Sequence, residues 1–286
     1  MFPEWLEWPL RGWVNDFVDW LVVNFGDFFE QIANSTLFVI IRIEQLLRAS
    51  PWWLIVAIAA LLAWHASRRL VLVPGVVAAL MLIGSLGLWT LAMQTLALML
   101  VAVAVTVAIG IPVGILMARY DGVQATLRPV LDLMQTMPSF VYLIPAVMLF
   151  GLGKFSALLA TVIYAVPPLI RLTDLGIRHV DPEVVEASTA YGATASQKLF
   201  GVQLPLALPS IMAGINQSIM MALAMVVIAS MIGARGLGEE VLYGLQRLDP
   251  GAGAAGGIAI VALAVVLDRI SQAYGARIQK HRHIGS

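Results

Sequence analysis

Few residues in this chain have the type and spacing needed to catalyse a reaction. The chain has no cysteine, which excludes a thiol nucleophile, a disulfide and a cysteine-ligated metal. It also lacks a Gly-x-x-x-x-Gly-Lys-Ser/Thr loop for nucleotide phosphates and a His-Glu-x-x-His zinc motif. We therefore expect no catalytic residue, no metal site and no cofactor bound by this chain.

Four other residues could carry proton or metal chemistry. His281 and His283 could bind a metal, although a solvated basic terminus is the commoner role for such a tail. Asp132 and Asp174 lie near the ends of apolar runs, where they could relay protons. Carboxylates at such positions more often cap a helix or stay hydrated, and we prefer that interpretation.

One polar segment, residues 181–205, lies between long apolar runs, so its polarity needs an explanation. Asp181 and Pro182 are a helix start, because the carboxylate caps the backbone and proline needs no N–H at the first helical position. Gly192 is placed to end that helix in a left-handed turn. Thr194 and Gln197 form a capping box for a second short helix. Pro205 and Pro209 are expected to break the chain before the next apolar run.

The pattern Glu186-Ala187-Ser188, three residues, Gly192, nine residues, Val202-x-Leu204-Pro205 resembles the EAA loop of membrane subunits of ATP-binding cassette importers. Ser188 replaces the usual third alanine and Val202 the usual isoleucine. In that family the loop is a coupling helix that docks into a groove on the cytoplasmic ATPase subunit. An ordinary amphipathic loop between membrane helices is the alternative. The resemblance implies that the ATPase-coupling residues are Glu183, Glu186, Ala187, Ser188, Tyr191, Gly192, Leu204 and Pro205.

The elements that must position this segment are membrane helices. Hydrophobic residues make up 60% of the chain and charged residues 12%, whereas soluble domains are roughly 25% charged. The composition predicts an all-α polytopic membrane protein of about seven transmembrane helices. We expect spans at about 51–66, 73–92, 95–118, 130–150, 155–173, 207–232 and 254–274.

Residues 1–50 differ from the rest, because acidic residues and tryptophans recur among apolar ones. Part of this stretch is expected to lie along the membrane surface, and Arg42 and Glu44 end its last apolar run. If the loop at 174–206 is cytoplasmic, alternation of the spans places the N-terminus outside and the C-terminus inside. Of the 17 Lys and Arg residues, 11 then lie inside, as the positive-inside rule requires.

Two further stretches, residues 132–153 and 216–238, together with Pro167-Pro168-Leu-Ile-Arg171, resemble permeases of glycine betaine, proline and choline importers. These stretches hold uncharged polar side chains, prolines and methionines within apolar runs. Such residues can line a path or simply hold helices together. The candidate pathway or gate residues are Gln135, Thr136, Pro138, Ser139, Tyr142, Asn216, Gln217, Met220, Met221 and Met225.

The resemblance implies the fold of a type I ABC importer permease and divides the chain into four parts. These are an external segment (1–50), peripheral helices (51–92), the transmembrane core (93–275) and a cytoplasmic basic tail (276–286). It also implies a homodimer, two ATPase subunits that hold ATP and Mg²⁺, a separate extracytoplasmic binding protein and location in the inner membrane. Nothing indicates a nucleic-acid partner. Two alternatives remain: an ABC importer permease for another small amino-acid-like solute, and an ion-driven secondary transporter. A secondary transporter would more often show inverted repeats and ionisable groups at mid-membrane, and we find neither in the sequence.

Overall fold

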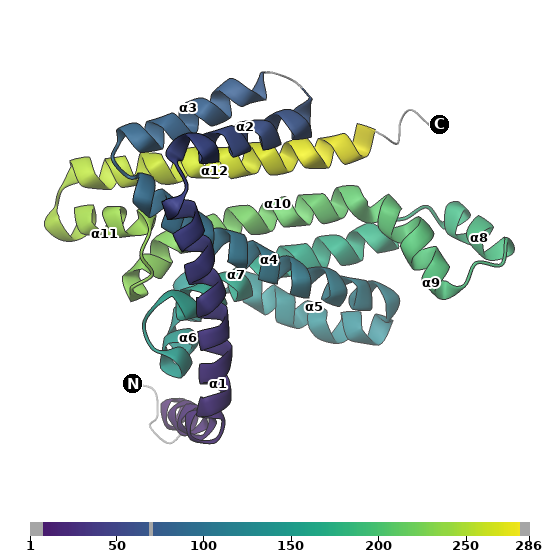
Figure 1. Cartoon of the computed structure of the whole chain (residues 1–286). Helices are drawn as coiled ribbons and strands as arrows, with labels where there is room; N and C mark the ends of the chain where they lie inside the picture. The colour runs from purple at the N-terminus through teal and green to yellow at the C-terminus, as the bar shows by residue number, and fades with distance from the viewer. Residues whose placement is uncertain (1–7, 69–70, 281–286) are drawn as a thin grey trace, which may run out of the picture.

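A computed structural model describes residues 8–68 and 71–280, and these residues form helices and short connections without a strand. Its helices, shown in Figure 1, are α1 (Leu10–Ala49), α2 (Trp52–Ser67), α3 (Leu72–Ser85), α4 (Trp89–Arg119), α5 (Asp121–Thr136), α6 (Leu143–Phe150), α7 (Lys154–Arg178), α8 (Pro182–Ala190), α9 (Ala195–Lys198), α10 (Leu204–Ala229), α11 (Leu237–Arg247) and α12 (Pro250–Lys280). Four helical segments are long and apolar enough to cross a membrane: α4, α7, residues 195–232 and most of α12. Counting each of two bent helix pairs as one span gives up to six, and α3 is a shorter apolar helix.

Helix α7 is the centre of the bundle, because it is the most buried of these four segments and packs along both α4 and α10. Glycines permit the close contacts on both sides. A Cβ on Gly114 of α4 would lie 2.5 Å from the Thr173 side chain of α7, and one on Gly176 of α7 would lie 2.6 Å from Ser210 of α10. At these points the backbone of one helix lies directly against a side chain of the next. A residue larger than glycine would prevent this packing.

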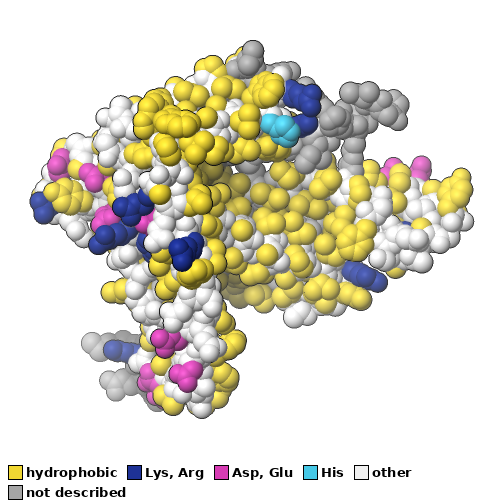
Figure 2. Space-filling view, in the orientation of Figure 1, with side chains coloured by type: hydrophobic (Ala, Val, Ile, Leu, Met, Phe, Trp, Pro, Cys, Tyr) yellow, Lys and Arg dark blue, Asp and Glu magenta, His cyan; other side chains and the backbone are white. Residues whose placement is uncertain are grey.

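A second layer consists of α2, α3 and α12, which share one apolar cluster with the start of α4. Figure 1 shows this layer lying along the bundle of α4, α7 and α10. In the space-filling view, apolar side chains cover the middle of the helices, and many of the charged ones gather toward the ends of the molecule (Figure 2). That distribution suits a protein whose middle is surrounded by lipid.

The predicted span at 130–150 is wrong as a single helix. The chain ends α5 at Thr136, turns through Ser139–Tyr142 and continues as α6, with a bend of 112° between the two parts. Met137 precedes Pro138 and adopts an extended backbone, as residues before proline do because of steric clash with the ring. The hydroxyl of Tyr142 donates a hydrogen bond to the Met134 carbonyl across this break.

Two other expected boundaries also differ from the structure. The expected span 73–92 crosses a real interruption, since α3 ends at Ser85 and α4 begins only at Trp89. Pro205 and Pro209 do not break the chain before the apolar run, because both lie inside α10. A π-helical turn, Leu199–Gln203, leads directly into this helix, so the helical path runs on through both prolines.

The N-terminal region is one helix of 40 residues that continues through Arg42 and Glu44, where its apolar run ends. Glu44 is only 7% exposed and forms an ion pair with Lys154 at the start of α7. It also accepts a hydrogen bond of 3.1 Å from Gln94 of α4. These partners neutralise the carboxylate in its buried position. Figure 1 shows α1 lying across the bundle, a direction compatible with the prediction that part of it follows the membrane surface.

The ends of α10 provide a test of orientation, because α8 and α9 lie at one end and α11 at the other (Figure 1). The chain has no cysteine, so single cysteines report accessibility without background. Leu248 follows α11 and is 87% exposed. The substitution Leu248→Cys should therefore give a cysteine that reacts with a membrane-impermeant maleimide in intact cells. Ser196→Cys in α9 should react only after permeabilisation. The reverse pattern would contradict the orientation.

Candidate coupling site

The candidate coupling segment, residues 181–205, folds locally as its sequence predicts. The carboxylate of Asp181 accepts a hydrogen bond of 2.9 Å from the backbone N–H of Glu183, which confirms the predicted start of α8. Thr194 and Gln197 form the predicted capping box at α9. Short-range hydrogen bonds therefore fix both helices in a segment that has few buried side chains.

Gly192 adopts the predicted left-handed conformation, with φ of +80°. The Gly192 N–H donates to the Thr189 carbonyl at 2.9 Å, and the Ala193 N–H donates to the Ser188 carbonyl at 3.1 Å. Together these bonds form a Schellman motif that satisfies the last carbonyls of α8. A Cβ at Gly192 would meet no atom within 4 Å, so backbone conformation rather than space requires glycine there.

The coupling segment presents a mixed face to its surroundings. Tyr191 is 93% exposed and Phe200 65% exposed, and Glu183, Glu186 and Ala187 are also exposed. Exposed aromatic side chains beside carboxylates suit a protein contact better than they suit water alone. Sequence reasoning found Tyr191 but missed Phe200, which lies in the π-helical turn Leu199–Gln203.

The inner face of the coupling segment is packed unevenly against the core, more firmly at its junction with α10 than at α8. Leu199 is buried against α7 and α10 with Leu169 and Ile211. Val185 and Ser188 of α8 are half-buried, and Lys198 donates a 3.1 Å hydrogen bond to the Thr189 hydroxyl. A cavity of about 240 Å³ separates part of α8 and α9 from the ends of α4 and α7. The junction with α10 is thus more firmly packed than α8 itself.

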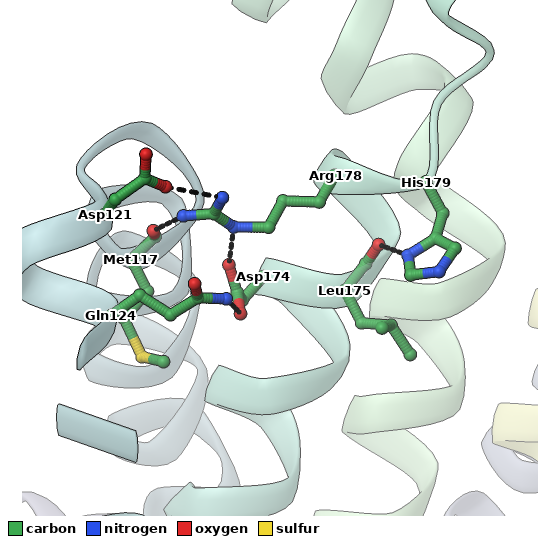
Figure 3. Close-up of polar contacts among 7 residues, drawn as sticks. All are labelled: Met117, Asp121, Gln124, Asp174, Leu175, Arg178 and His179. Carbon is green, nitrogen blue, oxygen red and sulfur yellow. Dashed lines mark hydrogen bonds and ion pairs between the residues drawn. The ribbon is translucent and has the colours of Figure 1, made fainter.

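An arginine at the last position of α7 ties the base of the segment to neighbouring helices (Figure 3). Arg178 donates from Nε to Asp174 Oδ1 at 2.9 Å and from Nη1 to Asp121 Oδ1 at 2.7 Å. Its Nη2 donates to the Met117 carbonyl at 2.7 Å. Gln124 adds a bond of 2.8 Å to Asp174 Oδ2. One guanidinium therefore joins α4, α5 and α7 three residues before Asp181.

We name these four side chains, Asp121, Gln124, Asp174 and Arg178, the Arg178 cluster. Its geometry gives Asp174 a role other than proton relay, because both carboxylate oxygens accept hydrogen bonds within the cluster. Sequence reasoning missed the other three members. A weak signal was present in the spacing of Asp174 and Arg178, four residues apart on one helix face.

The candidate pathway residues lie in several different environments. Gln135, Thr136, Pro138, Gln217 and Met220 are exposed, whereas Ser139 and Met221 are half-buried. Tyr142 and Met225 belong to one buried cluster between α6, α7 and α10. Asn216 points to α12, where it donates to Asp268 at 3.2 Å and accepts from Ser271. The structure thus separates a surface set from residues that hold helices together.

Comparison with known proteins now adds to this geometry. A family model described as "Binding-protein-dependent transport system inner membrane component" matches residues 110–280, which include the Arg178 cluster and the whole coupling segment. The chain belongs to this family. Among residues 8–68 and 71–280, no group of three or more His, Cys, Asp or Glu side chains is placed to hold a metal ion.

Three curated relatives cover nearly the whole chain. The glycine betaine/proline betaine permease protein ProW of Escherichia coli is 47% identical over 93% of this chain and 75% of the relative. The glycine betaine permease protein OpuAB of Bacillus subtilis is 47% identical over 92% and 93%. The glycine betaine/carnitine permease protein GbuB of Listeria monocytogenes is 45% identical over 94% and 96%.

A solved structure has the same fold. The inward-facing MetNI methionine ABC transporter matches with a TM-score of 0.58 and 24% identity, covering 68% of this chain and 95% of the matched chain. The fold is therefore that of an ABC importer permease, as the sequence resemblance implied.

Gly192 offers a test of the coupling segment that separates backbone strain from bulk. A β-branched residue at positive φ is strained by about 1 kcal/mol or more, so Gly192→Val should distort the end of α8. We expect normal insertion with loss of transport and of ligand-stimulated ATP hydrolysis. Gly192→Asn is the matched control, because asparagine tolerates the left-handed region, and it should retain most activity. Normal coupled turnover in Gly192→Val would contradict this role.

Arg178 provides the second test. Its side chain is 29% exposed, and that of Asp174 is 10% exposed, so Arg178→Gln leaves a buried carboxylate without its cation. We expect a loss of stability of about 1–3 kcal/mol, read by thermal denaturation, and a fall in transport per ATP hydrolysed.

Asp121→Asn is the matched control for Arg178→Gln, because the Asp121 side chain is 90% exposed and such pairs contribute little. Equal effects of the two substitutions on stability and on coupling would show that the cluster does not act through Asp174.

Proposed function

We propose that this chain is the permease subunit of an ATP-driven importer of glycine betaine and related quaternary amines, with choline and proline-like osmolytes as relatives. The observation that carries the proposal is identity of 45–47% to three permeases named for glycine betaine, over more than 90% of the chain. A quaternary ammonium donates no conventional hydrogen bond, so tight capture relies on aromatic faces. That capture is assigned to a separate extracytoplasmic binding protein.

In this proposal two ATPase subunits supply the energy, and ATP and Mg²⁺ bind there rather than to this chain. The proposed coupling residues belong to the coupling segment, residues 181–205: Glu183, Glu186, Ala187, Ser188, Tyr191, Gly192, Leu204 and Pro205. The exposure of Tyr191 and Phe200 supports a docking role for this face. Such a helix lying in a groove on the partner would use aromatic anchors and carboxylates together.

Two copies of the chain would form the transport path between them. The exposed amide of Gln217 supports this arrangement, since it lies on α10, a mostly apolar helix on which Met220 is also exposed. A polar side chain in a membrane segment normally faces protein or water rather than lipid. The surface residues Gln135, Thr136 and Pro138 are proposed to line the same path.

Coupling follows from the way the segment is attached. Closure of the ATPase subunits would move α8 and α9, and the Arg178 cluster would transmit that movement to α4, α5 and α7. The helices packed at Gly114 and Gly176 would then move with them. ATP binding can shift the balance of inward- and outward-facing states only by interacting differently with the two.

The deciding experiment is uptake into proteoliposomes that contain this chain with its ATPase and binding-protein partners. Glycine betaine, choline and proline should be compared with methionine, a sugar and phosphate, with and without ATP. We expect ATP-dependent uptake of glycine betaine. Methionine uptake without any response to quaternary amines would refute the substrate assignment but keep the importer architecture. Uptake driven by an ion gradient without the ATPase would indicate a secondary transporter.

A further inference from the structure

A polar stripe runs along the exposed side of α5. Its members are Arg128, Asp132, Gln135 and Thr136, spaced as i, i+4, i+7 and i+8, and all four are exposed. The adjacent side of α5 packs against α4 and α7 through Leu131. Charged side chains within a membrane region face water or protein rather than lipid, so this stripe marks a surface that is turned away from lipid.

The stripe meets a second arginine on α7. Arg171 donates a hydrogen bond to Asp132 and forms an ion pair with it. The side chains of this pair are 34% and 54% exposed, respectively. The Nε atom of Arg171 is buried and has no hydrogen-bond partner among the described residues. The Nε–H group of Arg171 therefore has no acceptor in the described part of the chain, whereas Nη2 donates to Asp132.

Arg128 and Arg171 line the same cavity, which has a volume of about 260 Å³ and lies between α5 and α7. Asp174, the carboxylate that also lines it, accepts bonds from Arg178 and Gln124 on its two oxygens. Arg128 forms no ion pair with any residue in the described ranges 8–68 and 71–280. The cavity is thus lined by two arginines, of which Arg171 is paired with Asp132 and Arg128 has no ion pair within those ranges, and by one carboxylate that is already engaged. The free charge of Arg128 favours an anionic group as ligand.

A small zwitterion matches both charges of this surface. We propose that Arg128 and Arg171 bind the carboxylate of the cargo while Asp132 attracts its quaternary ammonium, forming a weak site on the inner part of the path. Guanidinium groups suit carboxylates because their planar donors match the two oxygens. The inference rests on the proposed function and adds the residues that distinguish a zwitterion from a simple cation.

The pair between Asp132 and Arg171 suits a transient site. Exposed ion pairs contribute little to stability, so a passing ligand can replace each partner with its own opposite charge. The stripe also begins beside the break at Met137 and Pro138 and runs from there toward the Arg178 cluster. A ligand that moves from this helix break toward the Arg178 cluster would meet Gln135 and Thr136 before it reaches the charged residues of the stripe.

Cysteine protection tests this site in the complete, purified transporter complex without nucleotide. Gln135→Cys lies on the stripe, and Leu133→Cys is the matched control, since Leu133 is 64% exposed but lies on another side of α5. We expect glycine betaine to slow labelling of Gln135→Cys by a water-soluble maleimide several-fold and to leave Leu133→Cys unchanged. Choline, which lacks the carboxylate, should protect less.

Arg171→Gln and, separately, Arg128→Gln should remove the difference between glycine betaine and choline. Arg128 is exposed and unpaired, so its replacement should not affect folding. A merely structural role for Arg171 would not produce a carboxylate-dependent difference. Equal protection at positions 133 and 135, or none at 135, in a complex that transports glycine betaine would overturn the site alone. A complex that neither transports nor is protected by glycine betaine would overturn the proposed function as well.

Discussion

The close contact of α7 with α4 and α10 is the constraint on which the rest of the structure depends. At Gly114 and Gly176 a side chain of the neighbouring helix lies close to the backbone. A Cβ added to either glycine would lie only 2.5–2.6 Å from that side chain. Apolar burial drives helix association weakly in a lipid environment, so such contact supplies much of the attraction. Because packed helices rearrange between discrete states rather than deform continuously, these three helices form a unit that can carry movement from one end to the other.

The Arg178 cluster extends that unit to the coupling segment. The guanidinium contacts α4, α5 and α7 just before α8 begins, and Leu199 anchors the other end of the segment against α7 and α10. Both ends of the segment are thus held by the core, while Tyr191 and Phe200 are left exposed. The same fold therefore leaves aromatic side chains of the segment exposed and joins its base to α5, since Asp121 and Gln124 of the cluster belong to that helix.

The sequence predicted those features that depend on near neighbours. The cap at Asp181, the capping box at Thr194 and the left-handed Gly192 each follow from interactions over a few residues, and all three are confirmed. Features that depend on distant partners were not predicted. From the sequence, Glu44 marks only the end of an apolar run. Its burial depends on an ion pair with Lys154, which lies 110 residues away in the chain. The bend within 130–150 was missed for a different reason: its local signal, Pro138, is ambiguous, because proline is often tolerated inside membrane helices, as Pro112 is in α4.

We infer that the coupling segment moves with α4, α5 and α7 as one body. Spin labels on Ser196→Cys in α9 and Thr126→Cys in α5 test it by pulsed electron paramagnetic resonance, with unlabelled subunits added so that only distances within one chain are measured. Both sites are exposed, and the chain has no other cysteine. The account predicts one narrow distance distribution that is the same in the nucleotide-free and ATP-trapped complexes. A distribution that shifts beyond its own width or splits on ATP binding would contradict it.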